Sequence, residues 1–161
     1  MRLAVPVLLA LAFAAAADGG AGRTVRAHGV ALTIPAGWQR VAPAGDGAVV
    51  DPRTLLVVGT AGVSARPTGC QIAAYRVPVR GAVVVIVGWS GGSLTKPGRW
   101  PLKALKSVQR RVFECFAGSG AAASLDLGGK AYQVNVLVGG SASAREVGSA
   151  LAVGRSFRLA P

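Results

Sequence analysis

The run Ala82-Val83-Val84-Val85-Ile86-Val87 is the stretch of this sequence that decides its fold. It is the most apolar run outside the first residues of the chain, and four Val and one Ile give it the β-branched composition that favours strands. We therefore expect residues 82–87 to form a central strand of a sheet.

Strand patterns recur on both sides of this run. Residues 55–60 are continuously apolar, which is typical of a buried strand. Residues 30–34 instead alternate larger apolar side chains with Ala31 and Thr33, as in a strand with one buried face. Strands are predicted in all at residues 30–34, 38–41, 55–60, 72–77, 82–87, 113–116, 121–127 and 131–138.

Turn signals predict how some of these strands are joined. Arg80-Gly81 would connect strand 72–77 to strand 82–87 as a tight hairpin. Gly128-Gly129 separates two runs of strand composition within residues 121–138, which predicts a second hairpin. Neighbouring strands would then run antiparallel.

One helix is predicted near the C-terminus. Ser143 followed three residues later by Glu146 is a capping-box signature. Gly154 is a good C-terminal stop. Gly148 lies inside the helix at a cost of up to about 1 kcal/mol relative to Ala, which suggests a close approach to a neighbour. One face of the helix would carry Ala144, Val147 and Leu151.

These elements predict an α+β domain. It would contain a largely antiparallel sheet of about six to seven strands with one or two helices packed on it. Residues 18–161 have the length of a single domain, and a chain of this size can bury one hydrophobic core without further support. There is no internal repeat and no evident linker.

The segment Ile34-Pro35-Ala36-Gly37-Trp38, at the end of a predicted strand, resembles the start of PsbP-like secreted domains. The closing part of the chain, from Gly129 through the capped helix to Phe157, is similar in the order of its elements. The chain also resembles uncharacterised small exported bacterial proteins. The resemblance implies an antiparallel sheet flanked by helices and a docking or accessory role, with no catalytic residues to carry over. The Cys70 and Cys115 pair is not a general feature of that fold.

The N-terminus has the pattern of an export signal. Arg2 precedes an apolar stretch that ends with small residues at Ala15 and Ala17, and Asp18 follows. The stretch is shorter than the roughly 20 residues that a membrane-spanning helix needs. The sequence therefore predicts a signal peptide over residues 1–17 and a secreted or extracytoplasmic location, in a bacterial cell envelope.

Two cysteines, Cys70 and Cys115, lie 45 positions apart. An isolated pair in an oxidising compartment usually forms a disulfide. The alternatives are a redox-active or metal-binding pair, but there is no C-x-x-C motif and the single histidine, His28, is distant in sequence. A disulfide is therefore predicted.

Charge is the main functional signal. The chain has 18 Lys and Arg against six Asp and Glu, with a net charge of +12. Such an excess predicts attraction to a polyanion, such as anionic lipid or a cell-wall polymer. The alternative is a solvated surface whose charge has no specific partner. The densest run has no acid within it and contains Lys96, Arg99, Lys103, Lys106, Arg110 and Arg111. Its second half, residues 102–112, suits either a helix or an extended segment.

One motif indicates a different function. Gly88-Trp89-Ser90-Gly91-Gly92 fits the G-x-S-x-G pattern of hydrolases, in which a serine nucleophile follows a strand. That fold places its catalytic histidine after the serine, whereas His28 precedes Ser90 and no histidine follows it. The motif match keeps a small secreted serine hydrolase using Ser90 as an alternative hypothesis, and the missing histidine makes it the weaker one.

Other chemistry has weaker support. Tetrahedral zinc sites need three or four ligands, and His28 has no evident partners once the cysteines are paired. No two of the acids Asp46, Asp51, Glu114, Asp126 and Glu146 stand out as an acid–base pair. We therefore predict a non-catalytic exported docking domain with no metal and no cofactor. Its partner would be an anionic envelope surface or another exported protein, with no specific nucleic acid. A structural envelope protein without a specific ligand is a further alternative.

Overall fold

The computed structural model describes residues 22–44, 51–91, 105–110 and 112–161. These residues form eleven strands and one helix. The strands are β1 (Arg23–Ala27), β2 (Val30–Ile34), β3 (Trp38–Arg40), β4 (Arg53–Thr60), β5 (Ser64–Ala65), β6 (Tyr75–Arg76), β7 (Ala82–Gly88), β8 (Gln109–Arg110), β9 (Ser119–Leu127), β10 (Lys130–Val138) and β11 (Arg158–Leu159). The helix is α1 (Ala144–Arg155). None of the described residues forms a helix that is long and apolar enough to span a membrane.

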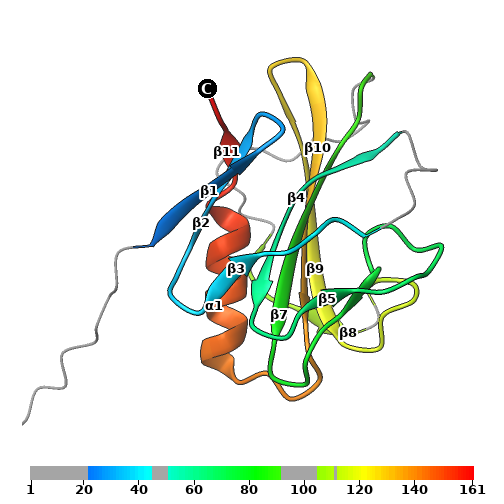
Figure 1. The fold of residues 1–161 in the computed structure, drawn as a ribbon, viewed down its shortest axis with the longest axis vertical. Helices are drawn as coiled ribbons and strands as arrows, with labels where there is room; N and C mark the ends of the chain where they lie inside the picture. Colours follow the sequence, from blue (N-terminus) through cyan, green and yellow to red (C-terminus); the bar gives the residue numbers. More distant parts are fainter. Residues whose placement is uncertain (1–21, 45–50, 92–104, 111) are drawn as a thin grey trace, which may run out of the picture.

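A six-stranded sheet forms the centre of the molecule, in the order β3-β4-β7-β10-β9-β8 (Figure 1). Every strand pair in it is antiparallel, and β7 lies between β4 and β10. Two smaller antiparallel sheets, β1-β2-β11 and β5-β6, accompany it. The α+β class and the central strand 82–87 are thus confirmed. The described strands are more numerous than expected, because several pair over only two residues.

One face of the large sheet is covered by α1 and the β1-β2-β11 sheet, which lie side by side on the left of Figure 1. Val84 and Ile86 of β7 point into this core, together with Leu32 of β2 and Phe157, which follows α1. The Phe157 ring centroid lies 5.5 Å from that of Tyr132 on β10. The three-stranded sheet is therefore tied to the large one through side-chain packing.

The opposite face has its own apolar cluster. Val83, Val85 and Val87 of β7 pack there against residues of the segment that contains β5 and β6. Both faces of β7 are thus covered, which explains why its sequence is continuously apolar. Within this cluster, the Tyr75 hydroxyl accepts a hydrogen bond from the Ala44 N–H at 2.9 Å. Burial raises the pKa of the Tyr75 phenol above its ordinary value of about 10.

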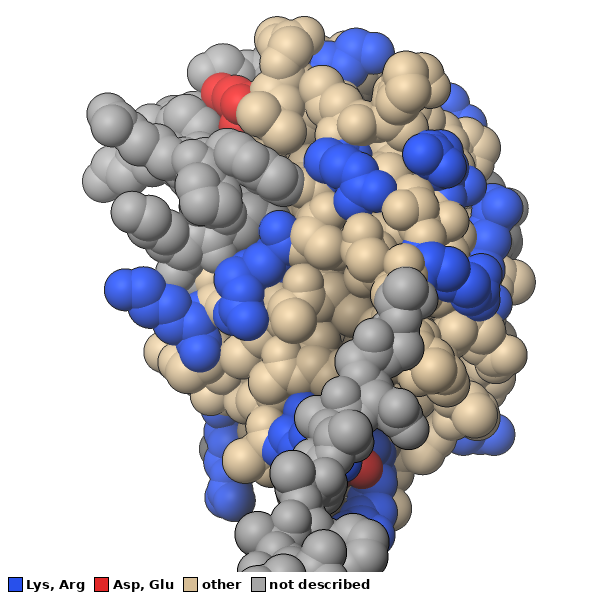
Figure 2. Space-filling view, turned by 90° about the vertical axis from the view of Figure 1, so that its left-hand side faces the viewer, with Lys and Arg blue, Asp and Glu red and all other residues tan. Residues whose placement is uncertain are grey.

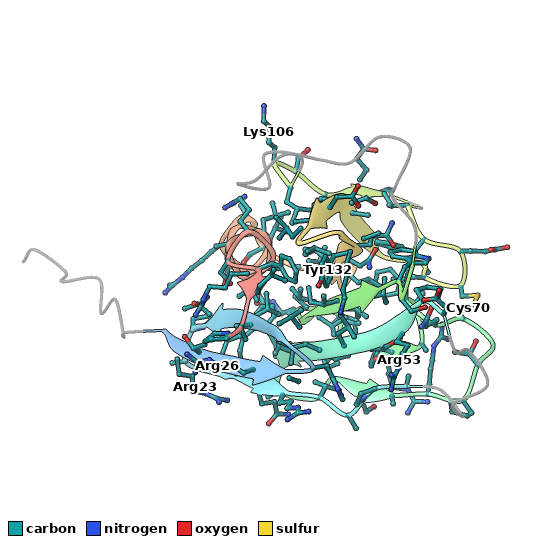
Figure 3. All side chains as sticks on the ribbon, turned by 90° about the horizontal axis from the view of Figure 1, so that it is seen from above. Arg23, Arg26, Arg53, Cys70, Lys106 and Tyr132 are labelled. Atoms are coloured by element: carbon teal, nitrogen blue, oxygen red, sulfur yellow. A yellow bond between two sulfur atoms is a disulfide. The ribbon has the colours of Figure 1, made fainter. Side chains whose placement is uncertain are left out.

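A disulfide joins Cys70 to Cys115. It links segments on this second face of the large sheet, and we call these segments, residues 61–77 and 112–118, the second layer. It connects the loop before β6 to the turn before β9, and Phe113 and Phe116 of that turn pack against the second cluster. In the view from above, Cys70 lies on the opposite side of the large sheet from α1 and β1 (Figure 3). The predicted disulfide is confirmed.

One buried polar side chain lies on this second face. Asn135 of β10 is 0% exposed and faces Val85 across the strand pair. Its Nδ2 donates to the Val85 carbonyl at 3.3 Å, while its Oδ1 has no partner among the described residues. An unpaired buried acceptor costs free energy, so this side chain weakens the core in which it lies.

The predicted hairpin at Arg80-Gly81 is wrong. A turn does form, because the Gly81 N–H donates to the Pro78 carbonyl at 2.8 Å. However, β6 pairs with β5, and β7 pairs with β4 and β10. The strand predicted at 72–77 shrinks to β6 alone. The residues at 80 and 81 were enough to predict the turn. Which strands pair with each other depends on contacts across the whole sheet. The hairpin of β9 and β10 around Gly128-Gly129 is confirmed.

One further prediction is wrong, one strand was missed, and one open alternative is settled in part. Residues 113–116 form a turn, not a strand, with Cys115 at a φ of 65°. The strand β1 was not predicted, although it pairs with all of β2. Of the ambiguous stretch 102–112, Gln109–Arg110 forms β8 and Leu105 starts a turn, while residues 102–104 and 111 lie outside the described residues.

The capping box of α1 is confirmed. The Glu146 N–H donates to Ser143 Oγ at 3.3 Å, and the Ser143 N–H donates to the Glu146 carboxylate at 2.6 Å. This second bond lowers the pKa of Glu146. The two glycine assignments are wrong. Gly154 lies within the helix, which ends at Arg155, and Gly148 is exposed with open space beside it.

Candidate anion-binding face

The described residues include only four acids, and two of these carboxylates are occupied by hydrogen bonds to nearby serines. Glu146 belongs to the capping box. Asp51 accepts two hydrogen bonds from Ser90, one from the N–H at 2.9 Å and one from the hydroxyl at 3.0 Å. The other described acids are Glu114 and Asp126. Much of the basic surface is therefore left without a nearby carboxylate.

We use the name cationic face for a set of basic side chains carried by β1, β11, the end of α1 and the turn at Leu105 and Lys106. Figure 2 shows the side of the molecule formed by these elements, with blue side chains spread across it and red only at the upper left and at one spot low on the face. In Figure 3, Arg23 and Arg26 lie on one side of α1, and Lys106 projects from the other. The cationic face consists of Arg23, Arg26, Lys106, Arg155 and Arg158.

Arg158 makes the most hydrogen bonds of any member of this face. Its Nη1 donates to Thr33 Oγ1 at 3.0 Å and to the Ser156 carbonyl at 3.2 Å, and its Nη2 donates to Thr24 Oγ1 at 2.8 Å. The guanidinium thus lies across β2 and reaches β1. All its hydrogen-bond partners are neutral, so its positive charge is held in place without being compensated.

Strand register places a second arginine beside it. Arg158 on β11 and Arg26 on β1 are both opposite Ala31, one on each side of β2. Side chains of directly opposite residues point to the same face of a sheet. Arg26 is exposed and has no polar partner in the described part of the chain.

Ser156 connects the end of α1 to the same sheet. Its hydroxyl accepts from the Thr33 N–H at 2.8 Å and lies 2.6 Å from the Val153 carbonyl of the helix. This contact fixes the chain on both sides of it, so Arg155 at the helix end and Arg158 on β11 take defined positions relative to β2.

Arg155 extends the face towards the predicted basic run. Its Nη1 donates to the Leu105 carbonyl at 2.6 Å. Leu105 is 0% exposed and packs near Gly154 of α1. The next residue, Lys106, is exposed. The helix end therefore anchors this part of the run.

The structure brings together only part of the predicted site. Lys106 joins the cationic face, whereas Arg110 is exposed on β8, at the edge of the large sheet. The remaining predicted residues lie outside the described residues, and these are Lys96, Arg99, Lys103 and Arg111. The cluster around Arg158 was not predicted, because its members come from opposite ends of the sequence.

The hydrolase motif has a different environment from a nucleophile elbow. The Ser90 hydroxyl donates to Asp51, and both groups are exposed. His28 lies in the turn between β1 and β2, on the three-stranded sheet. A serine nucleophile needs a general base to take its proton, and here the neighbouring group is a carboxylate that already accepts two bonds. This pair suits loop anchoring.

The described residues contain no group of three or more His, Cys, Asp or Glu side chains that could hold a metal ion. No family model, curated protein or solved structure matches the chain. The similarity to PsbP-like domains therefore stays a prediction.

Proposed function

We propose that this protein is a non-catalytic exported domain that docks on an anionic surface of the cell envelope through its cationic face. The observation that supports this is the uncompensated charge of five basic side chains on adjoining elements, none of which has a carboxylate partner among the described residues. The bonds that three of them make are to hydroxyl or carbonyl oxygens.

The face suits long-range attraction to a charged surface. A basic side chain near an anionic membrane contributes about 1 kcal/mol, and this attraction weakens over about 10 Å at moderate salt. Several such side chains on one side of a domain also orient it as it approaches. The charges in Figure 2 spread over an area, which matches a planar surface better than a single linear chain.

Export forms the second part of the proposal. The Cys70–Cys115 disulfide is of the kind that persists in oxidising compartments. The predicted signal peptide over residues 1–17 lies outside the described residues. An exported domain with this charge would meet anionic lipid headgroups at the outer side of the cytoplasmic membrane, and we take such a lipid surface as its partner.

The test is charge reversal with a matched control. The variant Arg26→Glu with Lys106→Glu changes two exposed members of the cationic face that make no polar contact with described residues. The control, Arg53→Glu with Arg76→Glu, makes the same change in net charge at exposed positions on β4 and β6. Figure 3 shows Arg53 well away from Arg23 and Arg26.

Binding to vesicles of phosphatidylglycerol and phosphatidylcholine would be measured by co-sedimentation over a salt series. We expect the first variant to lose binding and the control to retain most of it. Equal losses in both would show that net charge alone is responsible and that no docking face exists. Absence of wild-type binding at low salt would reject the proposal.

A further inference from the structure

The outer surface of the β1-β2-β11 sheet carries an arrangement of donors that the docking role does not require. Val25 and Leu32 face each other across β1 and β2 and are buried in the core. The next pairs in the register point outward, and these are Thr24 with Thr33 and Arg26 with Ala31, the latter joined from the other side by Arg158.

The hydrogen bonds of Arg158 leave specific donors unused. A guanidinium has five N–H groups. Two on Nη1 go to Thr33 Oγ1 and the Ser156 carbonyl, and one on Nη2 goes to Thr24 Oγ1. The Nε–H and the second Nη2–H remain. A hydroxyl that accepts a bond keeps its own proton, and neither threonine hydroxyl donates to another described residue.

A second cation completes the arrangement. Arg26 and Arg158 flank Ala31, and paired strands place neighbouring Cα atoms about 5 Å apart, so the two arginine Cα atoms are roughly 10 Å apart on one face. Ala31 between them is small and only 1% exposed, so the side chains around it cover it and no polar group separates the two arginines at this position. No described carboxylate bonds to either arginine.

We propose that Arg158, Arg26, Thr24 and Thr33 form a binding site for the phosphate group of a lipid headgroup. Hydroxyl donors that are polarised by a guanidinium, with a second guanidinium beside them, match the several acceptor oxygens and the negative charge of a phosphate. The inference rests on the proposed docking function, because it names the chemical group that the cationic face recognises. Docking by charge alone would need neither the planar fork of Arg158 nor the hydroxyls.

The first experiment uses inorganic phosphate, added at constant ionic strength to the isotope-labelled, exported, oxidised protein and followed by NMR. We expect saturable shifts at β1, β2 and β11 that chloride does not produce. Shifts that are absent, or spread over all basic residues, would overturn the site. An adventitious ion only, held equally by chloride and phosphate, would do the same.

Two variants then remove the site without changing net charge. Arg158→Lys keeps the charge and loses the fork, and Thr24→Val with Thr33→Val removes the hydroxyls but keeps the side-chain shape. Arg53→Lys, on a different element, is the matched control. The site predicts that each of the first two variants binds vesicles containing phosphatidic acid about ten-fold more weakly. Vesicles of equal charge made with oleate, a carboxylate, should show little difference.

The outcomes separate the site from the docking function. Wild-type binding to anionic vesicles with no effect of either variant would leave docking intact and reject the phosphate site. Saturable phosphate shifts without any vesicle binding would reject docking and, with it, a lipid headgroup as the ligand, and would leave only a site for free phosphate. Tighter binding to a phosphodiester wall polymer than to vesicles would overturn the choice of lipid as the partner. Circular dichroism and urea unfolding check that each variant is folded.

Discussion

Two glycines in α1 should respond in opposite ways to the same substitution. A Cβ at Gly148 would meet nothing within 4 Å. A Cβ at Gly154 would lie 2.8 Å from Val136 Cγ2 and 2.9 Å from Leu105 Cδ1, closer than packed carbon atoms normally approach. Both glycines are inside the helix, so the intrinsic gain from Gly to Ala is the same at both.

The magnitudes follow from these two environments. Ala is favoured over Gly in a helix interior by up to about 1 kcal/mol, so Gly148→Ala should stabilise the protein by about that amount. Gly154→Ala has the same gain but adds an overpacking cost of about 2 kcal/mol, which gives a net loss of about 1 kcal/mol. The two variants should differ by about 2 kcal/mol, or roughly 8 °C in melting temperature for a domain of this size.

Urea unfolding of the oxidised protein at neutral pH measures both variants against the wild type. Equal stabilisation by the two substitutions would refute the reasoning, because it would mean that Leu105 and Val136 move aside at no cost. It would also weaken the anchoring of Leu105 on the helix, on which the position of Lys106 in the cationic face depends.

Three further predictions concern the second layer. Replacing Cys70 and Cys115 by Ser should lower the free energy of unfolding by about 4 kcal/mol, because the disulfide spans 45 residues, and a loss below about 1 kcal/mol in urea unfolding would contradict this. Asn135→Leu should raise thermal stability by about 1 kcal/mol, because it removes an unpaired buried acceptor; a clear loss would mean that Oδ1 has a partner. Because the pKa of Tyr75 is raised in the folded state, the unfolded state loses this proton first. The contribution of Tyr75 to the free energy of unfolding should therefore be constant below about pH 10. It should fall as the pH rises from there towards the pKa of Tyr75 in the folded state. An equal pH slope in Tyr75→Phe, from urea unfolding at several pH values, would disprove it.

The parts of the fold that carry strong local signals could be predicted. Strand 82–87, the hairpin around Gly128-Gly129 and the capped helix are each specified by residues close together in sequence. The hairpin at Arg80-Gly81 failed because its turn forms without pairing the strands beside it. Residues 113–116 failed because their aromatic side chains cover the sheet from a turn instead of joining it.

The candidate site could be predicted only in part, since it depends on contacts distant in sequence. Arg158 bonds to Thr24 and Thr33 across more than 120 positions. β1 has one buried side chain, Val25, and its alternation with Thr24 and Arg26 was the available signal. The two-residue strand β11 is too short for its sequence to indicate which strand it pairs with. Charge composition therefore predicted a cationic surface for an anionic partner and placed it in the run from Lys96 to Arg111, whereas the cluster around Arg158 was missed.

The most direct test of docking compares the two charge-reversal pairs in one salt series on phosphatidylglycerol vesicles. At low salt, Arg26→Glu with Lys106→Glu should bind far more weakly than Arg53→Glu with Arg76→Glu, and wild-type binding should fall steeply as salt is added. Equal binding by the two pairs, or wild-type binding that is insensitive to salt, would contradict a docking role for the cationic face.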